Sequence, residues 1–91
     1  SDYLELLDLF VQTSVSDLAA IAKAVASGDA PGAVAASHSI KGAAANLGLT
    51  DISAEARTIE ERSREGRLGD VGDAVRALEE RVAAVARSIK R

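Results

Sequence analysis

The chain has 91 residues and a formal net charge of −3; 47% of its residues are apolar, only 2% are aromatic, and none is cysteine. This length supports one domain, residues 1–91, with a modest aliphatic core. The lack of cysteine excludes disulfides and thiolate chemistry, and the acidic balance argues against nucleic-acid binding. No uninterrupted apolar run approaches the roughly 20 residues of a membrane span, so we expect a cytoplasmic domain without membrane insertion.

Apolar residues recur at alternating intervals of three and four positions in four segments. This spacing predicts four amphipathic helices, over residues 2–27, 30–47, 50–65 and 70–90. The short connections favour antiparallel neighbours, so the expected fold is all-α, an up-down-up-down four-helix bundle. A break in the first helix between Thr13 and Ser16 is an alternative, because Ser16 could cap a new helix.

The residues at the segment ends are typical of helix caps. The glycines that end the first three helices are expected to be Gly28, Gly48 and Gly66. The expected N-caps of the later helices are Asp29, then Thr50 or Asp51, then Asp70. In the first helix, the residues expected to face the core are Leu4, Leu7, Val11, Ser14, Leu18, Ile21 and Val25.

His38 is the only histidine in the chain, and it points away from the expected core. At about 100° per residue, Ala36 and Ile40 lie on one side of the second helix and His38 lies almost opposite to them. One turn later Gly42 costs the helix about 1 kcal/mol relative to alanine. A glycine there keeps the surface around the imidazole low. From its position alone, His38 could still be a surface histidine without a function.

The pattern formed by His38, Lys41, Gly42 and a helix-ending Gly48 resembles the core motif of the histidine phosphotransfer (HPt) domain of two-component phosphorelays. The similarity continues in three further elements: Gly28-Asp29, Ile59-Glu60, and Arg64-Glu65-Gly66. Three residues depart mildly from the family pattern: Ser37 stands in place of an alanine, and Ile40 and Ile59 in place of leucines.

The resemblance implies that His38 accepts a phosphoryl group from the aspartyl phosphate of a receiver domain and passes it to the aspartate of another receiver. Lys41 would supply positive charge near the phosphoryl group. Glu60 would accept a hydrogen bond from Nδ1 of His38 and leave Nε2 as the nucleophile. Alternatively, Glu60 only pairs with Arg64 one turn later, or Arg64 itself holds the phosphoryl group.

The chain has no P-loop, no glycine-rich nucleotide loop and no carboxylate cluster for Mg²⁺. We therefore expect a phosphocarrier without autonomous kinase activity and with no cofactor of its own, and we expect Mg²⁺ in the partner receiver. The expected partners are response-regulator receiver domains, with a histidine kinase as a further candidate, and the isolated domain is expected to be a monomer.

Receivers are expected to dock on small and apolar residues around His38. Besides Gly42, these are Val34, Ala35 and Ala45, with Leu6 and Leu9 of the first helix as an extension. The alternative for Leu6 and Leu9 is contact with a bent N-terminal helix.

Two other functions stay open at this point. One is the N-terminal phosphoacceptor domain of a chemotaxis-type histidine kinase, which carries the same histidine motif. The other is a helical bundle that only binds partners or dimerises. A bulky residue at position 42 would have favoured the binding-only bundle, and the chain has glycine there.

Overall fold

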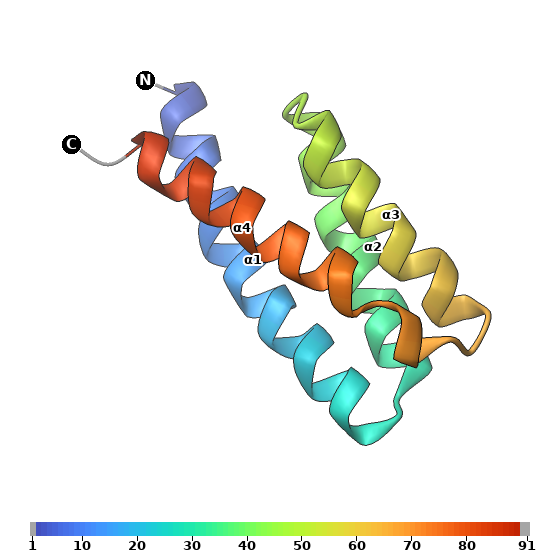
Figure 1. Ribbon diagram of the computed structural model, residues 1–91. Helices are drawn as coiled ribbons and strands as arrows, with labels where there is room; N and C mark the ends of the chain where they lie inside the picture. The colour runs from blue at the N-terminus through green and yellow to red at the C-terminus, as the bar shows by residue number, and fades with distance from the viewer. Residues whose placement is uncertain (1, 90–91) are drawn as a thin grey trace.

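The computed structural model describes residues 2–89, so the ends of the expected domain and of the fourth helix, at residues 1, 90 and 91, lie outside the described residues. Four α-helices and one short 3-10 helix make up the described part: α1 Asp2–Ser27, α2 Ala30–Asn46, α3 Thr50–Arg64, η1 Leu68–Asp70 and α4 Gly72–Ile89. The α-helices run alternately up and down (Figure 1), with α2 packed against α1 and α3, and α4 against α1 and α3. The expected all-α four-helix bundle is confirmed.

Glycines end the first three α-helices, as the sequence predicts. Gly28, Gly48 and Gly66 have φ angles of 74°, 75° and 75°, in the left-handed region that favours glycine just after a helix. The N-cap of α2 is also confirmed, because the carboxylate of Asp29 accepts a hydrogen bond from the backbone N–H of Gly32 at 3.0 Å.

The expected N-caps of the last two helices are wrong. The N-cap of α3 is Leu49, which gives no side-chain cap, and Thr50 is already helical. Asp70 lies in η1, and α4 begins at Gly72. The carboxylate of Asp70 accepts a hydrogen bond from Nε of Arg67 at 2.9 Å. Its side chain therefore holds the loop before α4.

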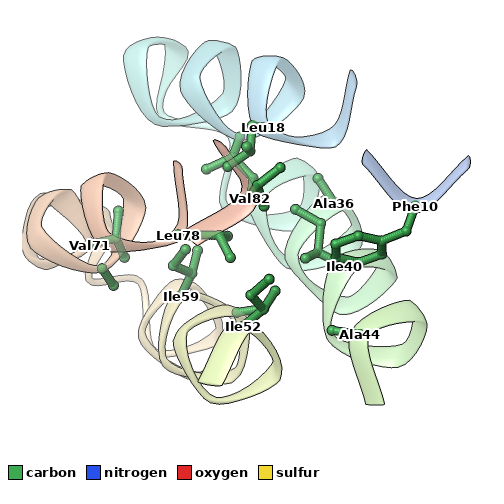
Figure 2. Close-up of a cluster of buried hydrophobic side chains, with 13 residues drawn as sticks. Phe10, Leu18, Ala36, Ile40, Ala44, Ile52, Ile59, Val71, Leu78 and Val82 are labelled. Carbon is green, nitrogen blue, oxygen red and sulfur yellow. The ribbon is translucent and has the colours of Figure 1, made fainter. Parts of the chain in front are cut away.

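The helix α1 is continuous, so the alternative of a break between Thr13 and Ser16 is wrong. Its core face includes Phe10, which is 3% exposed and absent from the expected set, whereas Leu4 and Val11 are less buried than expected. Figure 2 shows the Phe10 ring next to Ile40 on α2. The single phenylalanine thus fills space that the small residues of α2 leave between the two helices.

Branched aliphatic side chains form the core between the helices. The largest of those that are almost fully buried are Ile21, Ile40, Ile59 and Leu78, one from each α-helix. Small side chains on α2, among them Ala33, Ala36 and Ala44, are also buried and let the neighbouring helices approach closely. This close approach brings the side chains of α2 and α3 together at the site described next.

By length and composition alone, α1 could cross a membrane, although no uninterrupted apolar run of that length exists in it. A core helix of a soluble protein meets the same criterion. Large apolar side chains remain exposed along α1, and in residues 2–89 they are Tyr3, Leu4, Leu6, Leu9 and Val15. The apolar surface of α1 is therefore larger than the bundle buries.

Candidate functional site

His38 lies in the middle of α2 with its side chain 62% exposed, which confirms the expected direction. The neighbouring residues Ser37 and Ile40 are buried. Their burial fixes the rotation of the helix and turns His38 outward. A histidine in this position can reach a group held by another protein.

Glu60 of α3 holds the imidazole from the inside of the bundle. Its side chain is 1% exposed, and its Oε2 lies 2.9 Å from Nδ1 of His38. An ionised carboxylate only accepts hydrogen bonds, so Nδ1 must carry the proton. In the neutral ring the lone pair is then on Nε2. Of the two ring nitrogens, Nε2 is therefore the one with a lone pair available.

Two cations share the same carboxylate. Nζ of Lys41 lies 2.7 Å from Oε1 of Glu60, and Nη2 of Arg64 lies 2.9 Å from Oε2. Contact with His38 and pairing with Arg64, which the sequence left as alternatives, occur together. The side chain of Lys41 is 26% exposed and that of Arg64 is 59% exposed, so the two cations reach the carboxylate from different depths of the surface.

These contacts keep Glu60 ionised. Burial of the carboxyl group acts to raise its pKa, but hydrogen bonds from Lys41 and His38 and the positive charges of Lys41 and Arg64 outweigh burial. The net result is a pKa of Glu60 below its usual value of 4.5. At neutral pH the site thus contains the buried negative charge of Glu60, surrounded by the imidazole of His38 and the cations of Lys41 and Arg64.

A serine that sequence reasoning missed helps to hold α2 and α3 in register. The hydroxyl of Ser53 donates a hydrogen bond to the backbone carbonyl of Lys41 at 3.2 Å. Ser53 lies seven residues before Glu60, two turns along the same helix face. This spacing is a sequence feature that could have identified it. Its bond fixes the α2 backbone next to the site.

Gly42 has no packing role within its own chain. A Cβ atom added there would meet no atom within 4 Å other than the helix's own backbone. Its φ is also not in the left-handed region, so neither space nor backbone conformation requires glycine. Gly42 is exposed beside His38. Neither packing nor backbone conformation within the described residues therefore explains a glycine at this position.

The other residues expected to dock a partner also lie on accessible surface. Ala35 and Ala45 are exposed and Val34 is half-buried, and Leu6 and Leu9 are exposed on the continuous α1, not packed against a bent segment. Leu6 lies one turn before Phe10, whose ring packs against α2 (Figure 2). This places Leu6 on the side of α1 that faces α2.

Within residues 2–89, there is no group of three or more histidine, cysteine, aspartate or glutamate side chains that could hold a metal ion. In its described part, the site consists of an imidazole, a buried carboxylate and two cations.

Comparisons with known proteins agree on one family. The model of the Hpt domain family matches residues 5–88 of the chain. The structure is similar to the crystal structure of histidine-containing phosphotransfer protein B (HptB) from Pseudomonas aeruginosa PAO1, with a TM-score of 0.89 and 30% sequence identity over 97% of this chain and 76% of that one. A search of curated proteins gave no match.

Proposed function

Because the chain belongs to the Hpt family and is a histidine phosphotransfer module of a phosphorelay, we propose that His38 is the residue that carries the phosphoryl group. The observation that carries this proposal is the 2.9 Å hydrogen bond between Nδ1 of His38 and the buried Glu60. It leaves Nε2 free on an exposed side chain. His38 is also the only histidine in the sequence.

The reaction is a reversible displacement at phosphorus. Nε2 of His38 attacks the phosphorus of a receiver's aspartyl phosphate, the N–P bond forms, and the bond between phosphorus and the aspartate oxygen breaks. The aspartate leaves as a carboxylate. Nδ1 keeps its proton throughout, and the negative charge of Glu60 balances the positive charge that develops on the ring. The same steps in reverse pass the phosphoryl group to a second receiver.

Lys41 and Arg64 provide positive charge for the phosphoryl group. Both contact Glu60, which itself contacts His38, so both lie near the place where the phosphoryl group arrives. A phosphoryl group carries more negative charge than one carboxylate, and it attracts ammonium and guanidinium donors strongly. The proposal is that one or both cations turn from Glu60 towards the phosphoryl oxygens after transfer.

The receiver supplies Mg²⁺ and most of the stabilisation of the transition state, because this chain is proposed to bind no cofactor itself. Receivers dock over Gly42, Ala35 and Ala45, with Val34, Leu6 and Leu9 at the edge. We propose neither nucleic acid nor membrane as a partner, in keeping with the net charge of −3. The proposed compartment is the cytoplasm, where two-component receivers work.

The matches do not favour the two other functions considered. The solved structure that resembles this chain is titled a histidine-containing phosphotransfer protein. A binding-only bundle would not need a buried glutamate that orients an exposed histidine. The N-terminal domain of a chemotaxis-type kinase is likewise not favoured by these matches.

The direct test mixes the domain with Mg²⁺ and a panel of receiver domains that a small-molecule phosphodonor has phosphorylated. Phosphorus NMR or a phosphate-affinity gel then follows the label. We expect an acid-labile, base-stable phosphoryl group on the wild type and none on His38→Gln. Label on His38→Gln, or no label on the wild type with any receiver, would contradict the proposal.

Two substitutions of Gly42 separate docking from folding. Gly42→Ala should raise stability by about 1 kcal/mol, because alanine is the better helix former and the space is open. Gly42→Leu should also fold. It should slow transfer from a receiver at least roughly tenfold, since the leucine side chain blocks the approach of the receiver to His38. Unchanged transfer by Gly42→Leu would remove Gly42 from the docking surface.

A further inference from the structure

The helix α1 has a second apolar face that the proposed phosphotransfer does not use. Its central residue is Val15, which is 56% exposed. The other members recur at intervals of three or four residues along the same side of the helix, and they are Val11, Ala19, Ala22 and Ala26. Leu4 lies at the N-terminal end of this face. We call this surface, residues Val11, Val15, Ala19, Ala22 and Ala26, the outer face of α1.

The outer face is distinct from the surface that docks receivers. At about 100° per residue, Leu6 and Leu9 lie more than roughly 100° around α1 from the centre of the outer face. Leu6 borders α2, whereas Ala22 and Ala26 of the outer face line a groove with Val71 and Val75 on the α4 side. A partner on the outer face would therefore leave His38 accessible.

Two opposite charges lie at matched distances along α1 from the centre of the outer face, Asp8 on the face itself and Lys23 at its edge. Asp8 precedes Val15 by seven residues, and Lys23 follows it by eight. Lys23 is the only cation of α1, and within the described residues it makes no ion pair. Asp8 accepts a hydrogen bond only from Gln12 among the described contacts, at 3.0 Å. Each charge therefore has the capacity for an ionic partner from outside the chain.

A second copy of the same chain supplies that partner. If two α1 helices pack antiparallel about a two-fold axis at Val15, Asp8 of each copy comes within about one residue, or about 1.5 Å along the axis, of Lys23 of the other. The same arrangement places Val11 opposite Ala19, and Leu4 opposite Ala26, so larger side chains meet smaller ones. The positions of the charges and the sizes of the side chains thus agree with the same alignment of the two helices.

We propose that the outer face of α1 is the interface of a two-fold symmetric homodimer, with Val15 at its centre and an Asp8–Lys23 ion pair on each side. The proposed dimer differs from the monomer that the sequence led us to expect. Because the interface is one helix pair, the dimer is weak and forms as concentration rises. The two His38 side chains stay exposed, so a dimer can serve two receivers at the same time.

The test is the mass of the full chain in solution, measured by light scattering or analytical ultracentrifugation from micromolar to millimolar concentration. We expect the wild type to approach twice the mass of one chain. Asp8→Lys and Lys23→Asp should each weaken association at least roughly tenfold, because each turns two attractions into two repulsions. The double variant Asp8→Lys/Lys23→Asp should recover dimerisation, since the pairs are restored with their signs exchanged.

Neighbouring alanines give a matched control. Ala19 lies on the outer face and Ala20 lies away from it, and both are exposed. Ala19→Asp should abolish dimerisation and Ala20→Asp should not, with the helical content of both unchanged by circular dichroism. The proposal would be overturned by a wild type that is monomeric at all concentrations or by a double variant that is no more dimeric than the single variants. Equal effects of the two alanine variants, or binding of the outer face to lipid vesicles in place of a second copy, would also overturn it.

Discussion

Two clusters of ion pairs near the C-terminal half of α3 have almost the same distances and very different surroundings. Around Glu60, the pairs to His38, Lys41 and Arg64 measure 2.9, 2.7 and 2.9 Å, and the carboxylate is 1% exposed. Around Arg67, the pairs to Glu65 and Asp70 measure 3.0 and 2.9 Å, and the three side chains are 52%, 57% and 55% exposed. Distance alone would rank the two clusters as equal.

Burial separates them. An exposed pair gains little, because water screens the charges and the side chains lose freedom when they pair. A buried carboxylate has lost its water, so it must keep its partners or the fold loses stability. The Glu60 cluster therefore holds His38 in one orientation, whereas the Arg67 cluster only supports the turn between α3 and α4.

The largest effect that tests this difference is expected for Glu60→Ala. It removes a buried side chain and three interactions at once, so the free energy of unfolding should fall by about 2–4 kcal/mol. Urea unfolding at neutral pH measures it. The matched control is Glu61→Ala, because the neighbouring Glu61 is exposed. Equal losses for the two variants would show that burial does not distinguish them.

The pH dependence of stability should report the ionisation of Glu60. Burial acts to raise the pKa of Glu60, but the partners of its carboxylate outweigh burial and hold the pKa below the usual 4.5 in the folded protein. A lowered folded pKa means that the ionised form stabilises the fold fully above the unfolded pKa, and that this stability is lost as the pH falls through the folded value.

The comparison that isolates this contribution is the wild type against Glu60→Gln. The excess stability of the wild type over Glu60→Gln should shrink as the pH falls below about 4.5. Urea unfolding at a series of pH values measures it. A difference that stays constant or grows towards acid would show that the folded pKa of Glu60 is not lowered.

Smaller changes in the free energy of unfolding are expected for two serines of α3, one buried without a hydrogen-bond partner and one with a partner. Ser63 of α3 is buried, and its hydroxyl is the one buried side-chain polar atom in residues 2–89 without a hydrogen-bond partner. Ser63→Ala should therefore raise the free energy of unfolding by about 1 kcal/mol. Ser53→Ala, which removes the bond to the carbonyl of Lys41, should lower it by about 1 kcal/mol. Effects of the same sign for the two serines would contradict this account.

The smallest effect is expected for Arg67→Ala. It removes both pairs of the exposed cluster, and the stability should change by less than about 1 kcal/mol. The rate of phosphotransfer to His38 should stay unchanged, since Arg67 has no contact with Glu60. Thermal unfolding and a transfer assay on the same preparation check both. A loss as large as that of Glu60→Ala would remove the distinction between the two clusters.

The features that the sequence predicted correctly depend on local spacing. The exposure of His38 follows from its angle on α2, and the ends of the helices at Gly28, Gly48 and Gly66 follow from the conformational freedom of glycine. The features it missed depend on side-chain contacts that spacing along the chain does not specify. Asp70 could have been an N-cap, but the side chain of Arg67 pairs with its carboxylate.

The surroundings of Glu60 were likewise only partly predictable from the sequence. The family resemblance indicated its contact with His38, but not that its side chain would be almost fully buried with two cations on it. That burial follows from how closely the small side chains of α2 let α3 approach. Phe10 was missed for a related reason, because its ring fills a gap that forms only when α1 and α2 pack together.

The most direct test of the central claim is nitrogen-15 NMR of the imidazole before and after phosphorylation by a receiver. The chain has one histidine, so its two ring nitrogens can be assigned without ambiguity. The account predicts a proton on Nδ1 of His38 in the free protein and a phosphoryl group on Nε2 afterwards, with the proton still on Nδ1. A proton on Nε2 in the free protein, or a phosphoryl group on Nδ1, would contradict the role of Glu60 in selecting the nucleophile.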